Sequence, residues 1–323
     1  MGAPTAATLL STGRRVVVMS RGQTSGQGTD GRRPVLPAGC ETVICDRDIE
    51  DAFINALCSP TCPRIVIDFT AMSPAHIESV KRAHLKRPLQ HYVFVSTNMV
   101  YPGGVEAMDL SPMAAAGQRV DEASVRRDMA GEAPANYGGQ KLKCEALLAE
   151  AAMELGSRPP LPSTVIRPPA VVGAGCDSRH EKLHRFVAGL RPLPPPERVR
   201  PGAALPGHRF RVACANDVAS VLAAVVDRSP IEPAEAFNVA SGDSKGVTMD
   251  EYAEALAAAL PVRLEPPGAS VVVPGDANLR NYEKQGVLDT SRAERVLGFR
   301  PTPLDTFMEA VVAWHAPLLS TDA

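Results

Sequence analysis

The chain has 323 residues, which is enough for one large or two medium domains and too long to need disulfides for a core. Its 34 Lys and Arg nearly balance its 36 Asp and Glu, for a formal net charge of −2. These values exclude a mini-protein scaffold and argue against charge-driven binding to nucleic acid or an anionic membrane.

The cysteines and the apolar runs indicate the compartment. There are seven cysteines without a CxxC pair, so neither a disulfide framework nor a zinc ribbon is indicated. No apolar run approaches ~20 residues, and no basic segment precedes an apolar one at the start of the chain. We therefore expect a cytoplasmic protein that does not enter the membrane.

Short apolar runs rich in β-branched residues recur along the chain, as in buried parallel strands. They occupy residues 15–20, 42–45, 64–69, 91–96, 164–167 and 237–240. Apolar residues at helical spacing follow in residues 49–57, 75–85, 137–155 and 217–226. This alternation predicts βαβ units and an α/β fold, a doubly wound parallel sheet with helices on both faces.

The regular alternation ends after residue 167. Residues 191–206 contain six prolines, which a helix or a central strand does not accept. Helical spacing returns at residues 248–260 and 303–314. We expect residues 1–167 and 208–242 to form the larger domain, and residues 168–207 and 243–323 to form a smaller C-terminal region.

Two short motifs suggest chemistry but lack its context. Residues 26–31 match GxGxxG, yet the prolines that follow prevent the helix on which dinucleotide binding depends, so we interpret a surface loop. His180 and His184 match HExxH, but Arg179 and Arg185 make the segment a charged helix face. A zinc peptidase remains a remote alternative, and we expect no metal.

Tyr137 and Lys141 are four residues apart at the start of a predicted helix and so share one face. A nearby ammonium can lower a phenol pKa from its usual ~10, which would make Tyr137 a usable general acid or base. Alternatively, Tyr137 is a packing aromatic and Lys141 is its solvated neighbour.

The residues around this pair support the chemical interpretation. The strand at residues 91–96 ends in Ser96, Thr97 and Asn98, at the edge where open α/β sheets bind ligands. The motif S-T-x-x-V-Y at residues 96–101, then Tyr137 and Lys141, then Arg-Pro at residues 167–168 follow in order. In these motifs the chain resembles the extended short-chain dehydrogenase/reductase superfamily, the NAD-dependent epimerase/dehydratase family.

The resemblance implies a Rossmann-like larger domain, a substrate-binding smaller region and roles for individual residues. Thr97 would hydrogen-bond the substrate oxygen, Tyr137 would pass its proton, and Lys141 would hold the nicotinamide ribose. The residues implied for the cofactor are Gly2, Ser20, Arg21, Asp46, Arg47, Thr70, Ala71, Tyr137, Lys141 and Pro168. Those implied for the substrate are Asn98, Arg179, Arg209 and Arg211.

The residue after the second strand of the family pattern indicates the cofactor. The run at residues 15–20 is followed by Arg21, where an Asp or Glu would accept from a ribose 2′-hydroxyl. Arg21 could pair with a 2′-phosphate, so NADP(H) is favoured over NAD(H). An ordinary surface arginine is the alternative.

The sequence departs from the family at its start. If residues 15–20 are the second strand of the family pattern, Gly2 aligns with the last glycine of the phosphate-binding turn. The first strand of that pattern and its earlier glycines then have no counterpart in this sequence. This favours a sheet that is truncated at its N-terminal side, from a start placed too far downstream or in a cofactor-poor descendant. We therefore expect weak or no dinucleotide binding by the chain as written.

The leading hypothesis is an NADP(H)-dependent oxidoreductase or epimerase/dehydratase-like enzyme for a small, sugar-nucleotide-like substrate. The alternative is a non-catalytic protein of the same fold, either a pseudoenzyme or an RNA-binding protein resembling the chloroplast stem-loop-binding relatives. Near-neutral charge and an aromatic content of 4% disfavour RNA. The resemblance also implies a possible homodimer.

Overall fold

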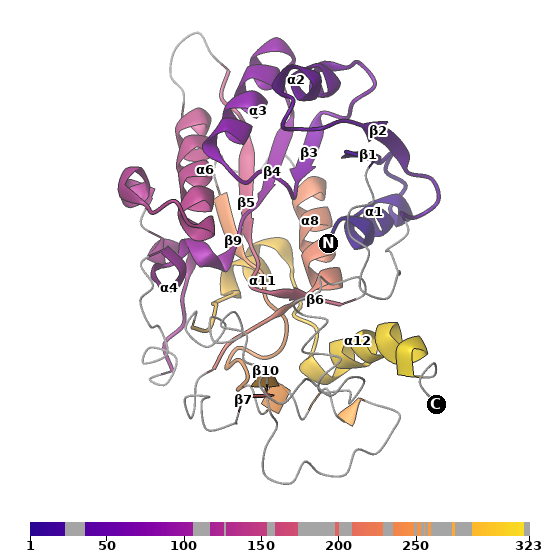
Figure 1. The fold of residues 1–323 in the computed structure, drawn as a ribbon, viewed down its shortest axis with the longest axis vertical. Helices are drawn as coiled ribbons and strands as arrows, with labels where there is room; N and C mark the ends of the chain where they lie inside the picture. The colour runs from indigo at the N-terminus through magenta and orange to yellow at the C-terminus, as the bar shows by residue number, and fades with distance from the viewer. Residues whose placement is uncertain are drawn as a thin grey trace.

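A computed structural model gives the fold (Figure 1). It describes residues 1–22, 36–105, 117–125, 127–153, 159–173, 198–199, 209–228, 235–248, 251–252, 255, 258–259, 273–274 and 286–319. The predicted GxGxxG loop, Arg179, His180 and His184 lie outside these ranges.

The strands of the main sheet are parallel, as predicted. The strands of the described chain are β1 (Val17–Ser20), β2 (Glu41–Ile44), β3 (Ile65–Asp68), β4 (His91–Val95), β5 (Ser163–Arg167), β6 (Val171–Val172), β7 (Arg198–Val199), β8 (Ala213–Cys214), β9 (Glu235–Asn238) and β10 (Val273–Pro274). The main sheet has four parallel strands in the order β3-β4-β5-β9. Parallel pairs β1-β2 and β6-β8 and the antiparallel pair β7-β10 are separate.

Helices cover both faces of the main sheet (Figure 1). The longer ones are α1 (Gly2–Ser11), α2 (Glu50–Cys58), α3 (Pro74–Lys86), α6 (Tyr137–Ala152), α8 (Ala215–Asp227), α11 (Ser291–Leu297) and α12 (Leu304–Leu319). Short turns are η1 (Asn98–Val100), α4 (Pro102–Val105), η2 (Glu122–Ser124) and η3 (Arg127–Glu132). The α/β prediction is confirmed.

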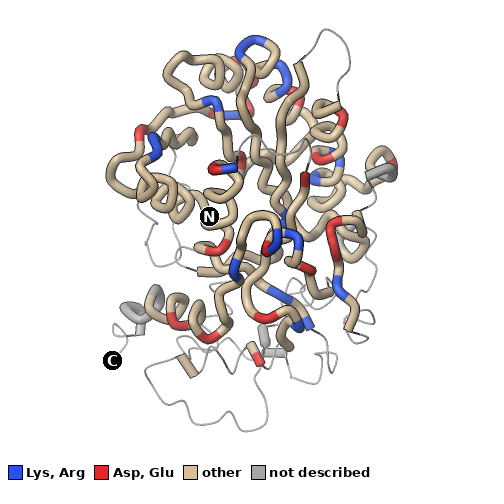
Figure 2. The backbone as a smooth tube through the Cα atoms, turned by 180° about the vertical axis from the view of Figure 1, so that it is seen from behind, with Lys and Arg blue, Asp and Glu red and all other residues tan. Residues whose placement is uncertain are grey.

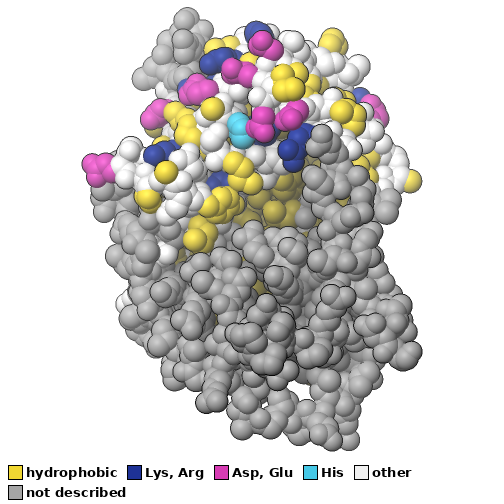
Figure 3. Space-filling model, viewed as in Figure 1, with side chains coloured by type: hydrophobic (Ala, Val, Ile, Leu, Met, Phe, Trp, Pro, Cys, Tyr) yellow, Lys and Arg dark blue, Asp and Glu magenta, His cyan; other side chains and the backbone are white. Residues whose placement is uncertain are grey.

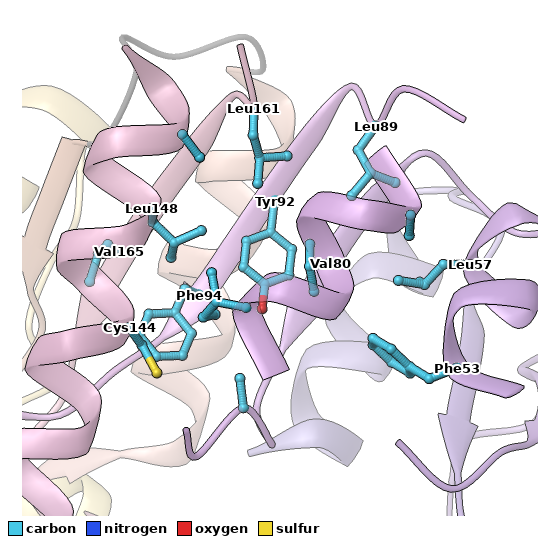
Figure 4. Packing of buried hydrophobic residues seen from close by; sticks show 14 of the residues in the cluster. Phe53, Leu57, Val80, Leu89, Tyr92, Phe94, Cys144, Leu148, Leu161 and Val165 are labelled. Atoms are coloured by element: carbon cyan, nitrogen blue, oxygen red, sulfur yellow. The ribbon is translucent and has the colours of Figure 1, made fainter. Parts of the chain in front are cut away.

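Strand β4 shows why the sheet lies at the centre of the core. All five of its residues are buried, and their side chains alternate between the two faces. Tyr92 and Phe94 pack among α2, α3 and α6 (Figure 4), whereas Val93 and Val95 pack with α8 and α11. A nearly continuous apolar strand is therefore required here, because neither face contacts water.

The β1-β2 pair is attached to the main sheet through side chains. Among the described residues β1 pairs only with β2, and β3 pairs only with β4, so both β1 and β3 are edge strands. Their apolar side chains are mostly half-buried. Arg47, which follows β2, binds Asp68 at the end of β3, so the carboxyl ends of both sheets lie at one edge.

The C-terminal part also contacts the main sheet. Ala293 in α11 and Phe299 pack with α8 and β9. Helix α11 stops at Gly298, whose φ of 68° is a left-handed cap that glycine adopts readily. A second cluster joins α12 to Phe210 and Tyr252 and forms the smaller region.

Candidate active site

Thr97 and Asn98 lie directly after the central strand β4. The Thr97 hydroxyl accepts a hydrogen bond from the Met99 amide at 3.2 Å, which caps η1, and the residue is only 7% exposed. The Asn98 amide donates to the Pro168 carbonyl at 3.0 Å, which ties the end of β4 to the end of β5. The structure thus brings together three of the predicted site residues, Thr97, Asn98 and Pro168.

Tyr137 and Lys141 come to the same place from the first turns of α6. The Tyr137 side chain is exposed, whereas Lys141 is buried and donates from Nζ to the Val95 carbonyl at 2.9 Å. The Lys141 Nζ lies 5.8 Å from the centre of the Tyr137 ring and 4.6 Å from that of Phe94. Lys141 is therefore not the solvated neighbour of the alternative interpretation.

Burial lowers the pKa of Lys141 to about 8, although the carboxylate of Asp68 acts in the opposite direction. The unfolded chain therefore binds this proton more tightly than the folded one, and stability should increase as the pH rises from about 8 towards 10.5. The full effect is about 3 kcal/mol. Lys141→Met removes the group, so urea unfolding should show wild type gaining stability relative to this variant over that range. A constant difference would contradict the prediction.

Gly138 allows α6 to approach the end of β4 closely. A Cβ atom at this position would lie 2.1 Å from the Met99 carbonyl oxygen, which is far inside van der Waals contact. The helix is started by Asn136, whose side chain accepts from the Gly139 amide at 2.8 Å. The first turn of α6 is therefore packed directly on the segment that follows Thr97.

We expect Gly138→Ala to move this turn and destabilise the protein by roughly 1–3 kcal/mol, the usual cost of overpacking. Gly131→Ala is the matched control because a Cβ there would meet no atom within 4 Å. Urea unfolding should show a lower midpoint for the first variant than for the control, and equal midpoints would refute the close contact.

A buried polar network lies under these residues, and the sequence interpretation gave it no role. The Ser96 hydroxyl donates to Glu145 at 2.6 Å, so this hydroxyl is already engaged within the network. Arg167 forms a bidentate pair with Glu145, at 3.1 and 2.6 Å. The Tyr101 hydroxyl accepts from Arg167 and donates to Asn238. Ser96, Tyr101 and Arg167 fall in motifs quoted for the resemblance, whereas Asn238 and Glu145 do not, and Glu145 lies four residues after Lys141.

The predicted cofactor residues on β2 and β3 form a second cluster. Arg47 donates to both Asp68 oxygens, at 2.7 and 2.6 Å, and to the Thr70 hydroxyl at 3.0 Å. Asp68 also accepts from the amides of Thr70 and Ala71 and from the Tyr92 hydroxyl. Burial alone would raise the pKa of Asp68, but Arg47 and these donors lower it overall. The strand-end loop is thereby fixed.

The other predicted cofactor residues are placed at the starts or ends of elements. Ser20 and Arg21 are exposed at the end of β1, and Gly2 is exposed at the start of α1. Asp46 accepts from the Asp48 amide in the turn that leads to α2.

The predicted role of Arg211 in substrate binding is not supported. Its guanidinium has five N–H groups, and all five donate to protein oxygens, at Ala240, Ser241, Gly242, Leu288 and Thr290. Burial lowers its pKa to about 10. Arg211 instead joins the segment after β9 to the segment before α11. Arg209 is half-buried and paired with Glu251.

Within the described ranges, no group of three or more His, Cys, Asp or Glu side chains could hold a metal ion. Nor does any described helix combine the length and apolar character needed to cross a bilayer.

No protein-family model matches the sequence, and no curated protein matches it. Solved structures do resemble it in fold. A UDP-glucose 4-epimerase is 18% identical with a TM-score of 0.71, and the match covers 99% of this chain and 95% of that one. The Thermotoga maritima UDP-glucose 4-epimerase solved with UDP-glucose is 18% identical, with a TM-score of 0.69 and coverage of 99% and 96%. The Bacillus cereus UDP-glucuronic acid 4-epimerase solved with NAD is 15% identical, with a TM-score of 0.66 and coverage of 98% and 95%. The chain therefore has the same fold as these UDP-sugar 4-epimerases, in agreement with the Rossmann-like α/β fold expected from its sequence.

Proposed function

We propose that the protein is a sugar-nucleotide epimerase or a related enzyme that moves a hydride between a substrate carbinol carbon and a nicotinamide cofactor. The observation that carries this proposal is that Lys141 is held at the Val95 carbonyl, two residues before Thr97 at the end of β4, with its ammonium 5.8 Å from the centre of the Tyr137 ring. The fold supports it, because structures of this fold include UDP-sugar 4-epimerases.

Each of the three residues has a defined task in the proposal. The exposed Tyr137 exchanges a proton with the substrate hydroxyl as its carbon is oxidised or reduced. The Thr97 hydroxyl hydrogen-bonds the same oxygen and orients it. The Lys141 ammonium, held by the Val95 carbonyl, favours the phenolate of Tyr137 by its charge. The cofactor, when bound, supplies the hydride acceptor and donor.

The residues present fit the nicotinamide half of such a cofactor. Lys141 is a buried cation next to Tyr137, and Pro168 lies beside Asn98 at the same edge. For the phosphates, the described chain offers the N-terminus of α1 at Gly2. Arg21 favours NADP, whereas the neighbours solved with NAD favour NAD. We therefore propose a nicotinamide dinucleotide and leave the choice to titration.

The test is epimerisation itself. The protein is incubated with UDP-glucose and, in separate samples, with NAD or NADP, and the anomeric protons are followed by NMR. Appearance of a second UDP-hexose with either cofactor supports the proposal. No new sugar from UDP-glucose or UDP-glucuronic acid, together with no heat of NAD or NADP binding in calorimetry, would overturn it.

An RNA-binding role has less support. Basic and acidic residues are interspersed along the described chain (Figure 2) and on the described part of the face in Figure 3. Several arginines are already paired, among them Arg14 with Asp227 and Arg15 with Glu41. Binding through phosphates uses clusters of unpaired cations. RNA retention that falls with salt, without cofactor binding, would reverse this ranking.

A further inference from the structure

One face of α6 contacts the end of β4 at consecutive residues. Lys141 donates to the carbonyl of Val95, and Glu145, one turn further along the helix, accepts from the hydroxyl of Ser96 at 2.6 Å. Tyr137 lies one turn before Lys141. Any axial shift of α6 along β4 would therefore break both hydrogen bonds and move Tyr137 together with the helix.

The carboxylate of Glu145, which accepts from Ser96, is held in place by Arg167, the last residue of β5. Both side chains of the Glu145–Arg167 pair are fully buried, at 0% exposure, and they meet through two N–H donors. Arg167 also donates to the Tyr101 hydroxyl and the Glu122 carbonyl, both at 3.2 Å. The carboxylate thus connects one helix to two neighbouring strands.

Stability alone does not account for such a pair. Burying two charges is costly, and apolar side chains of the same volume often stabilise a core equally well or better. Several of the buried residues of α6 are small, among them Gly138, Cys144 and Ala151, so few large apolar side chains fix the position of this helix. Apolar packing is not directional and tolerates small shifts, whereas a bidentate hydrogen-bonded pair accepts a single geometry.

We propose that the Glu145–Arg167 pair is a positioning device that sets the register of α6 against β4 and β5, and so places Lys141 and Tyr137 opposite Thr97. Neither residue contacts the reacting atoms, so both are positioning residues. The catalytic consequence rests on the proposed function, but the placement of Lys141 does not and can be measured without any substrate.

The main variant is Glu145→Met with Arg167→Met. Replacing both partners leaves no uncompensated buried charge, so the protein should keep a cooperative urea transition. Glu145 favours the charged form of Lys141, so loss of this carboxylate alone would lower the pKa of Lys141, and a rise in that pKa reports a change in its position. The control is Glu235→Met with Arg292→Met, which removes a partly exposed pair between β9 and α11.

Lys141 is followed by NMR of lysines labelled with ¹³C at Cε, assigned with Lys141→Met. If α6 loses its register, the ammonium leaves the Val95 carbonyl and becomes hydrated, and its pKa should rise by at least one unit from about 8, towards that of an exposed lysine. The control should titrate like wild type. An unchanged titration in the folded Met variant overturns the proposal.

Ser96→Ala provides a second test if the double variant does not fold. It removes one hydrogen bond to Glu145 and no charge, so the pKa of Lys141 should move in the same direction by a smaller amount. No change contradicts the proposal. Where wild type epimerises a sugar nucleotide, the double variant should lose at least tenfold in kcat with KM within twofold. A shifted Lys141 titration in a protein without activity would retain the positioning role and reject the proposed function.

Discussion

Replacing Tyr137 by Phe should lower kcat by about 10²–10⁴, the usual contribution of a positioned acid or base. The ring and its contact with Lys141 remain, so the loss isolates the hydroxyl that exchanges the proton. Because the side chain is exposed at the start of α6, the fold should not change. The variant should therefore bind the cofactor as wild type does and fail only in the chemical step.

The measurement is the initial rate of epimerisation under saturating UDP-sugar, with cofactor affinity determined by calorimetry. Tyr252→Phe is the matched control, because that tyrosine is buried against Phe210 in the smaller region. A Tyr137→Phe protein that keeps more than a third of the wild-type rate would rule out the proton-transfer role.

Asp68→Ala should destabilise the protein by about 3–5 kcal/mol, the cost of removing one member of a buried ion pair. Arg47 would keep its charge next to the Phe53 ring without its carboxylate, and the Tyr92 hydroxyl would lose its acceptor. Urea unfolding at neutral pH measures the loss. Asp48→Ala is the control, because the Asp48 side chain is 66% exposed and its pair with His76 should contribute less than about 1 kcal/mol.

The same carboxyl contributes to stability in acid. Its pKa is lowered in the folded protein, so its stabilisation is present above the pKa of the unfolded chain and is lost as the pH falls through the folded value. In Asp68→Asn this part of the acid dependence should be absent. A wild type and variant that lose stability in parallel on acidification would contradict the assignment.

The sheet and helices could be predicted because their signal is local. A strand buried on both faces must be apolar throughout, and this predicts β4 at residues 91–96, where the structure has His91–Val95. Ends were less accurate, because capping sets them. The helix expected at residues 137–155 ends at Ala152, and the one expected at residues 217–226 is Ala215–Asp227.

The site could be predicted in part for a similar reason. Thr97, Tyr137 and Lys141 were predicted from one strand end and one helix face. The structure has Thr97 directly after β4 and Lys141 bonded to the end of the same strand, and the roles of the three residues stay predictions. The partners of Glu145 and Arg211 were not predicted, because they come from distant segments that only the fold brings together. Because Glu145 and Arg211 are buried, they bind other protein groups, and the sequence alone does not show which charged residues are buried.

The separation of β1-β2 from the main sheet has a consequence for how the molecule opens. No backbone hydrogen bond of the described chain joins β1 to β3, so the pair can detach by breaking side-chain contacts such as that of Arg47. It should therefore behave as its own foldon, with amide hydrogen exchange governed by a local opening that is less costly than global unfolding. The amides of β4 and β5, by contrast, should exchange only when the whole core unfolds.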